Sequence, residues 1–361
     1  MKTGTANLPL HYGSAPRWLF EQMTKLSREI SLVLIDEYGT EEYLKRLADP
    51  NWFQAFGCVL GFDWHSSGVS TTTCAAIKEG LRGTEKELGI FVCGGKGRTS
   101  RKTPGEIETF GQQYSFDSQP LIYASKISAK VDNNALQDGY QLYHHSFFFT
   151  KEGKWAIVQQ GMNSLNHWAR RYHWLSDEVV DFVNEPHSAI ASQNIEQTTK
   201  NKVLNLVANE SKENRKITAK LSQQKPEKIT KTIKKLQETK LPERHEILIS
   251  DINPKNLKKI FLSTYEHQPE NFEKLLGMKG VGPKTIRALS LISELVYGAP
   301  ISTRDPARYS FAHGGKDGVP YPVNRKTYRQ SIEFLKEATN KAKLGYYEKL
   351  HALRRLHNMI K

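Results

Sequence analysis

An acidic residue stands two positions before a histidine at two places in the N-terminal half of the chain. Asp63 precedes His65, and Glu185 precedes His187. On an extended segment, residues two apart project to one face, so Asp63 would lie beside His65, while Glu185 and His187 offer another carboxylate and imidazole. Such a pair can bind a metal ion or act as acid and base. The surroundings of Glu185, expected to follow an amphipathic helix, also fit a plain surface helix end, because Glu-Pro commonly terminates helices.

A second concentration of polar residues lies between residues 126 and 145. It contains two lysines, two aspartates and a histidine pair: Lys126, Lys130, Asp132, Asp138, His144 and His145. Because side chains alternate along a strand, only one of the two histidines can face a given site. Hydrolysis of a phosphodiester bond needs carboxylates that hold a divalent cation, a base for the attacking water and a cation beside the phosphate. These residues supply all three kinds of group.

We therefore expect a nuclease site with Mg²⁺ or Mn²⁺ as its cofactor. Carboxylate and imidazole groups would bind the metal: Asp63, Asp132, Asp138, Glu185 and His187. Further groups would serve as ligand or base, or stabilise charge on the phosphate: His65, His144 or His145, and Lys126 or Lys130. The alternative is that the aspartates are separate turn residues and that His65 is satisfied within the core. The spacing matches neither the HExxH zinc signature nor an EF-hand.

A glycine-rich basic segment at residues 94–102 could wrap a phosphate. Its cationic side chains are Lys96, Arg98, Arg101 and Lys102. The GxxxxGK[ST] pattern of a P-loop is absent. A flexible, solvated loop is the alternative interpretation of the same residues.

The clearest DNA-binding signal is the segment LLGMKGVGPKTIRAL at residues 275–289, which resembles a helix–hairpin–helix element. Gly280 and Gly282 permit a tight turn, and backbone N–H groups at the start of the second helix would point toward a phosphate. Positively charged and hydroxyl side chains flank the turn: Lys279, Lys284, Thr285 and Arg287. Contacts of this kind hold the DNA backbone without reading bases, so binding would weaken with salt. The alternative is a glycine turn between two packed helices.

DNA glycosylases carry a similar element, followed by a loop with a catalytic aspartate. Here Ser302 stands where that aspartate would be, and Asp305 comes three residues later. A hydroxyl cannot stabilise a developing sugar cation as a carboxylate can. A glycosylase-like repair enzyme that uses Asp305 is therefore the lesser alternative.

The N-terminal part is expected to be an α/β or α+β domain. Helical spacing of apolar residues predicts one or two helices over residues 16–47. Aromatic and β-branched residues at 140–149 and 155–160 predict a β-hairpin. Glycine- and serine-rich stretches at 61–73 and 94–105 are expected to be loops. Helical periodicity returns in the last hundred residues and predicts a small all-helical domain.

Charge divides the chain in a way that suggests three parts. Residues 1–199 hold 19 Lys and Arg against 22 Asp and Glu, residues 200–244 hold 13 against 5, and residues 245–361 hold 20 against 11. We expect a catalytic domain at 1–192, a basic linker or helical arm at 193–245 and a helical DNA-binding domain at 246–361. Such an asymmetry is typical of a nucleic-acid-binding half joined to a more acidic one.

Several segments are similar to those of the prokaryotic family catalogued as domain of unknown function 763. They read TGTANLPLH at 3–11, FQAFG at 53–57, GFDWHSSG at 61–68, QDGYQLYHH at 137–145 and QQGMN at 159–163. The resemblance covers essentially the whole chain and implies an archaeal or bacterial protein. It brings no settled chemistry.

The leading hypothesis is a metal-dependent nuclease that acts on single- or double-stranded DNA. A non-catalytic DNA-binding or scaffold protein is the second hypothesis. No apolar run approaches the ~20 residues that cross a bilayer, so we expect no membrane contact and a cytoplasmic location, with nucleoid association left open. Aromatic residues of the N-terminal half serve cores and subunit interfaces alike, so homo-oligomerisation also stays open.

Overall fold

The structure is a computed structural model that describes residues 15–62, 66–165, 167–192, 203–241, 245, 249–307 and 325–358, with only the backbone in 325–328. Asp63 and His65 therefore lie outside the described residues. No helix within these ranges is both long and apolar enough to span a membrane. The expected mixture of α and β structure is confirmed.

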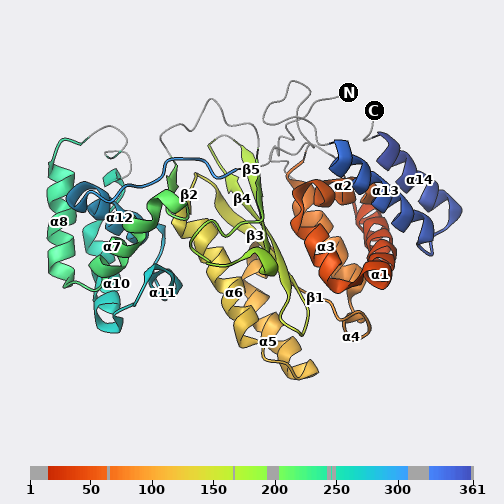
Figure 1. Cartoon of the computed structure of the whole chain (residues 1–361), viewed down its shortest axis with the longest axis horizontal. Helices are drawn as coiled ribbons and strands as arrows, with labels where there is room; N and C mark the ends of the chain where they lie inside the picture. Colours follow the sequence, from red (N-terminus) through yellow and green to blue (C-terminus); the bar gives the residue numbers. More distant parts are fainter. Residues whose placement is uncertain are drawn as a thin grey trace.

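A five-stranded antiparallel sheet forms the centre of the fold (Figure 1). Its strands, in spatial order, are β1 (Phe91–Lys96), β3 (Gln141–Phe149), β4 (Trp155–Asn163), β5 (Trp168–Leu175) and β6 (Ala189–Ala191). The expected hairpin is confirmed as the β3–β4 pair, in which Phe149 lies opposite Trp155. The local alternation of aromatic and β-branched residues suits a sheet that is covered on both faces.

Three N-terminal helices cover one face of the sheet. They are α1 (Arg17–Ala48), α2 (Pro50–Leu60) and α3 (Gly68–Leu81), and they pack on Phe148 and Val158. The expected helix over residues 16–47 is confirmed, with a break at Gly39, where φ is +83°. Trp18, near the start of this helix, is exposed.

Helices α5 (Thr103–Tyr114) and α6 (Gln119–Lys130) cover the opposite face. Phe147 and Phe149 point to this side, because neighbouring strand residues alternate between faces. The short helix α4 (Glu85–Leu88) and the 3₁₀ turn η1 (Gly97–Lys102) flank β1. A π-helical turn, η2 (Val131–Ala135), continues α6 and leads into the two-residue strand β2 (Leu136–Gln137).

Two expected loops are wrong in large part. Residues 68–73 begin helix α3, and residues 94–105 hold the end of β1, the turn η1 and the start of α5. In α3 the residues Val69, Thr71 and Thr73 are buried against the rest of the domain. Tertiary packing here overrides the weak helix propensity of β-branched residues. The expected amphipathic helix before Glu185 is also wrong, since β5 is followed there by the 3₁₀ turn η3 (Ser176–Glu178) and by turns.

A second group of helices extends the core beyond α6. Strand β7 (Leu204–Asn205) pairs with β2 and is followed by the 3₁₀ turn η4 (Asn209–Ser211). The helices are α7 (Lys212–Ser222), α8 (Pro226–Glu238), α10 (Pro254–His267), α11 (Phe272–Gly277) and α12 (Pro283–Tyr297). The described part of the expected linker at 193–245 thus includes two helices whose apolar residues join the core. The three-part division of the chain stays a prediction.

Helices α13 (Arg325–Lys341) and α14 (Tyr346–Asn358) lie at the other end of the molecule (Figure 1). Leu335 and Leu356 pack into the same cluster as α1 and α2. Arg355 donates a hydrogen bond to the carbonyl of Val59. The C-terminal helices therefore return to the N-terminal ones and do not join the α7–α12 group.

Two glycines near β1 test how tightly the sheet edge is packed. Gly94 has φ +86°, and a Cβ atom there would lie 2.1 Å from the carbonyl oxygen of His145. Gly97 also has a positive φ, +60°, but no atom lies within 4 Å of its Cβ position. Both alanine variants pay the cost of a left-handed backbone, about 1–2 kcal/mol. We expect Gly94→Ala to lose at least about 2 kcal/mol more than Gly97→Ala, because backbone must also move.

The measurement is the free energy of unfolding in urea for the two variants and the parent. Equal losses in both variants would contradict the packing of β1 against β3.

Candidate functional site

Three segments far apart in the chain meet at a pocket of about 240 Å³ beside the edge strand β6. They are the turn before β6, the stretch around β7 and the segment that follows α12. The polar lining residues are Glu185, His187, Asn205, Arg304 and Asp305. The remaining wall is apolar, formed by alanine, valine, isoleucine and proline side chains. An apolar pocket with a few convergent polar groups is the usual form of a ligand or active site.

His187 is held in the pocket wall by a buried carboxylate. Its Nε2 lies 2.5 Å from Oδ1 of Asp132, and only 7% of the His187 side chain is exposed. The other oxygen of Asp132 accepts hydrogen bonds from Gln159 Nε2 at 2.7 Å and from Trp174 Nε1 at 3.0 Å. Asp132 is fully buried, and its orientation is fixed by donors from β4 and β5. The imidazole is therefore oriented as a positioned acid or base would be.

A second carboxylate of the pocket, Asp305, is held by a buried arginine. Arg170 bonds Asp305 Oδ2 at 2.8 Å and Asp138 Oδ2 at 2.7 Å. Asp138 also accepts from Tyr172 Oη at 2.8 Å. Burial opposes the charge of Arg170, but the two carboxylates outweigh it and raise the Arg170 pKa above its ordinary value. Asp138 is enclosed, whereas the Asp305 side chain is 22% exposed and lines the pocket.

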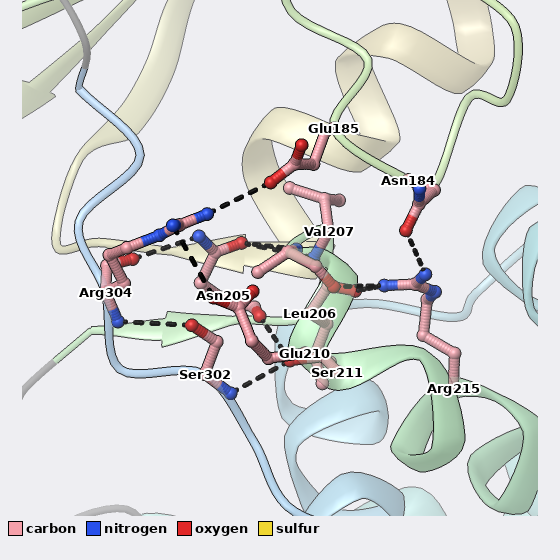
Figure 2. Close-up of polar contacts among 11 residues, drawn as sticks. Asn184, Glu185, Asn205, Leu206, Val207, Glu210, Ser211, Arg215, Ser302 and Arg304 are labelled. Carbon is pink, nitrogen blue, oxygen red and sulfur yellow. Dashed lines mark hydrogen bonds and ion pairs between the residues drawn. The ribbon is translucent and has the colours of Figure 1, made fainter.

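Arg304 lies at the rim of the pocket, where its guanidinium reaches two glutamates (Figure 2). Nη2 is 3.0 Å from Glu185, and Nη1 is 3.5 Å from Glu210. The side chain is 59% exposed, so these ion pairs are worth little in stability and can exchange for another anion. Its backbone carbonyl accepts from the amide of Asn205 at 3.0 Å, which ties the rim to β7.

Ser302 has a structural role beside this rim. Its carbonyl accepts from the Asn205 N–H, and its N–H donates to Ser211 Oγ at 2.9 Å (Figure 2). Arg215 braces the same region by donating to the carbonyl oxygens of Leu206 and Ala208. The Ser302 side chain is buried and does not line the pocket, so the carboxylate that lines the pocket after α12 is that of Asp305.

The segment at 130–137 also holds the connection between α11 and α12. Lys130 Nζ donates to the Val281 carbonyl at 2.7 Å, and Asn134 Nδ2 reaches the same oxygen at 3.3 Å. Gln137 Nε2 donates to the Pro283 carbonyl at 2.8 Å. Asp132 belongs to this same segment. One short stretch thus supports both the pocket and the glycine turn.

In the turn, Gly280 has the positive φ of +85°, whereas Gly282, the residue that precedes α12, has an extended backbone. Lys279 and Lys284 are exposed. Thr285 is buried, and Lys284 and Arg287 both pair with Asp251, so these three side chains are less free to meet a phosphate than expected.

The histidine pair lies in the interior and does not reach the pocket. His145 bonds Ser125 Oγ at 2.9 Å, and His144 lies 3.2 Å from Ser146 Oγ. Burial lowers the pKa of His144 to about 3 and that of His145 to about 4. Both imidazoles are neutral at pH 7.

The other predicted site residues are scattered. Lys126 is exposed on α6, and Lys130 is used in the α11–α12 support. The cationic residues of the glycine-rich segment are exposed around η1, on the far side of the sheet order from β6: Lys96, Arg98, Arg101 and Lys102. The structure places Glu185 and His187, both named as candidate metal ligands, in the wall of one pocket.

Asp132 and Asp138 do not share an open metal site. Each is buried, and each is engaged by its own donors. Among the residues that the structure describes, no three His, Cys, Asp or Glu side chains are grouped so that they could hold a metal ion. The expected set of Asp63, Asp132 and Asp138 therefore has no support from its described members.

Three important residues escaped the sequence analysis: Arg170, Asn205 and Arg304. Arg170 stands in an aromatic strand, WARRYHWL, where a fully buried arginine needs carboxylate partners. That pattern could have directed attention to Asp138 and Asp305. Nothing local marks Asn205 or Arg304, because their importance comes from contacts made about a hundred residues apart.

The buried histidines make stability depend on pH. The folded-state pKa values of His144 and His145 lie below the ordinary value near 6.5, so the unfolded chain binds more protons below that pH. Their contribution is complete above pH 6.5 and is lost as pH falls toward 4 and 3. When the pH falls from 7 to 5, each of these histidines should lower the free energy of unfolding by about 2 kcal/mol.

The check is urea unfolding of the parent and of His144→Gln at both pH values. The variant should lose about 2 kcal/mol less than the parent over this interval. An identical loss in both proteins would show that His144 is not a buried neutral imidazole.

Comparison with known proteins identifies the family but gives no function. No curated protein and no solved structure matches the chain. Residues 4–323 match the model of a family described as "Protein of unknown function (DUF763)". Because this match covers most of the 361 residues, the chain belongs to the DUF763 family.

Proposed function

We propose that this protein is a nuclease that holds DNA through the α11–α12 element and hydrolyses a phosphodiester bond at the pocket. The observation that carries the proposal is His187, which lines the pocket and is held by the buried Asp132. The proposed nuclease site is therefore the pocket beside β6 and not the set of Asp63, Asp132 and Asp138 that the sequence suggested. A cationic residue and two further carboxylates line the same pocket.

His187 would act as general base toward the attacking water. Asp132 accepts a hydrogen bond from the Nε2–H of His187, which leaves Nδ1 as the basic nitrogen. Asp132 also accepts hydrogen bonds from Gln159 and Trp174, so it cannot easily turn away from the imidazole. A positioned base of this kind contributes about 10²- to 10⁴-fold to a rate.

Arg304 would bind the phosphate that enters the pocket. Its guanidinium already pairs with two carboxylates, and the same fork of N–H donors matches phosphate oxygens. The apolar part of the wall would limit water around the scissile bond and strengthen this interaction.

We retain a divalent cation, Mg²⁺ or Mn²⁺, in the proposal, but with fewer protein ligands than the sequence suggested. Mg²⁺ commonly keeps several waters and binds one or two carboxylates together with substrate phosphates. Glu185 and Asp305 are the two carboxylates that line the pocket. They take the place of the three aspartates that the sequence suggested.

The α11–α12 element would hold the DNA as a helix–hairpin–helix. Support comes from the positive φ of Gly280, from the exposed Lys279 and Lys284 and from the start of α12 at Pro283. The N–H groups of the first helical turn lack intrahelical partners and favour an anion. Such contacts are independent of sequence.

The test is cleavage of labelled single- and double-stranded DNA with Mg²⁺, Mn²⁺ or EDTA. We expect His187→Gln to reduce metal-dependent cleavage about 100-fold or more while DNA binding is retained, because the base is lost and the α11–α12 element is unchanged. His267→Gln, on the exposed end of α10, is the matched control and should cleave normally.

Asp132→Asn keeps the shape of the side chain and should lower cleavage in the same direction, with thermal unfolding measured alongside. Full activity of a folded His187→Gln protein would refute the proposed base. Binding with no product under any metal would favour the DNA-binding or scaffold alternative.

Asp305 supports base excision as a second candidate. It is the first carboxylate after α12, it lines the pocket, and Arg170 holds it in place. A flipped base would occupy the pocket, and the Asp305 carboxylate would stabilise the sugar cation.

This candidate predicts abasic sites, which break only after treatment with alkali. Duplexes that carry single mismatched or damaged bases are incubated with the protein and split into alkali-treated and untreated samples. Asp305→Asn should remove the alkali-dependent breaks, whereas Glu210→Gln, which changes another carboxylate at the rim, should retain them. Breaks of equal yield without alkali would exclude base excision.

A further inference from the structure

We infer that the DNA bound by this protein is double-stranded and that its backbone lies across a lysine surface on α8 and α10, adjoining the α11–α12 turn. This inference rests on the proposed DNA binding and names its substrate class. We call the surface the α8–α10 lysine surface. Its members are Lys228, Lys231, Lys234, Lys235, Lys255, Lys258 and Lys259, all exposed.

The amphipathic pattern of α8 and α10 turns these lysines outward. In α8, Ile229 and Ile233 are buried in the core. In α10, Leu257 and Phe261 are buried in the same cluster. The two helices pack directly against each other, so their solvent-facing sides form one surface. Figure 1 shows both helices at the end of the molecule that lies opposite α13 and α14.

The α8–α10 lysine surface adjoins the glycine turn, with the carboxylate of Asp251 between them. Gln237 at the end of α8 donates to the Ile252 carbonyl at 2.7 Å, just before α10 begins. Lys284 at the start of α12 donates to the Asp251 carbonyl at 3.0 Å. A Cβ atom on Gly280 would lie 3.9 Å from the side chain of Ile260. The end of α8, the start of α10 and the turn are therefore neighbours.

The charge of this surface is largely uncompensated. The helices α8 and α10 carry seven lysines against the three glutamates Glu227, Glu238 and Glu266. Among the described residues, no carboxylate forms an ion pair with any of the seven lysines. The free ammonium groups can thus neutralise phosphates and release the counterions that DNA carries.

The chemistry of the surface favours a duplex over a single strand. Proteins that hold single strands stack bases on exposed aromatic side chains. In the described parts of α8, α10 and the turn, no exposed residue is aromatic, and Tyr265 is half-buried. Tyr297 is exposed at the far end of α12, about 20 Å from the turn at 1.5 Å per residue. A surface of lysines without aromatic side chains binds phosphates, and a duplex presents its phosphates along two regularly spaced strands.

The test compares binding of a 20-base-pair duplex and of a 20-nucleotide single strand by fluorescence anisotropy in EDTA over a series of salt concentrations. One variant replaces Lys231, Lys235, Lys255 and Lys259 by glutamine. The matched control replaces four exposed lysines outside the surface, Lys86, Lys151, Lys336 and Lys343, and makes the same change in net charge.

The parent should bind the duplex at least about tenfold more tightly than the single strand, since only the duplex matches the surface. Removal of four phosphate contacts should lower the slope of log affinity against log salt by about 3 to 4, at about 0.9 per contact. The control should keep the parental slope. Circular dichroism of both variants verifies that the helices are intact.

Equal losses in the variant and the control, or tighter binding of the single strand, would overturn the inference. If the parent still cleaves DNA with metal in that case, the proposed function stands and only the lysine surface is wrong. A parent that binds neither DNA at low salt would overturn the inference and the proposed function together.

Discussion

The buried carboxylate of Asp132 is the interaction on which the arrangement of the pocket depends. It accepts hydrogen bonds from β4, from β5 and from the turn before β6, through Gln159, Trp174 and His187. An acceptor with no access to water needs all of these donors, because each unmade hydrogen bond would leave a buried charge uncompensated. The need to satisfy Asp132 therefore fixes the sheet, the turn and the imidazole relative to each other.

A buried arginine imposes a similar constraint on the opposite wall. Arg170 comes from the middle of β5 and cannot lose its charge, so it requires carboxylates at both ends of its guanidinium. Asp138 satisfies one end from within the fold, and Asp305 satisfies the other from the segment after α12. This second pair ties the helical group α7–α12 to the sheet. The pocket is thus bounded by two contacts of different origin, the Asp132–His187 hydrogen bond and the Arg170–Asp305 ion pair.

The sequence predicted those elements of the fold whose conformation is determined by residues close to one another in the chain. The hairpin of β3 and β4 follows from alternating apolar residues around a short polar turn, and α1 follows from its 3.6-residue period. Helix α3 was missed because its threonines are poor helix formers, and the burial of Val69 and Thr73 against α2 favours the helix.

The candidate site was harder to predict because its partners are distant in sequence. Glu185 and His187 were both named as candidate metal ligands, and the structure places both in the pocket wall. Asp132 was named, but as a metal ligand, because nothing local shows that its oxygens are occupied by residues 27, 42 and 55 positions away. The histidine pair looked reactive in the sequence, yet the sheet buries it.

The short segment at 130–137 joins these constraints to the glycine turn. Asp132 bonds His187 in the pocket wall, while Lys130 and Asn134 hold the Val281 carbonyl of the glycine turn. In the proposed function, a DNA backbone bound at the glycine turn and a scissile bond beside His187 would therefore be positioned by one segment of the chain. With this arrangement, contacts between the glycine turn and the DNA backbone would orient the scissile bond in the pocket. Such orientation lowers the entropic part of the barrier to reaction.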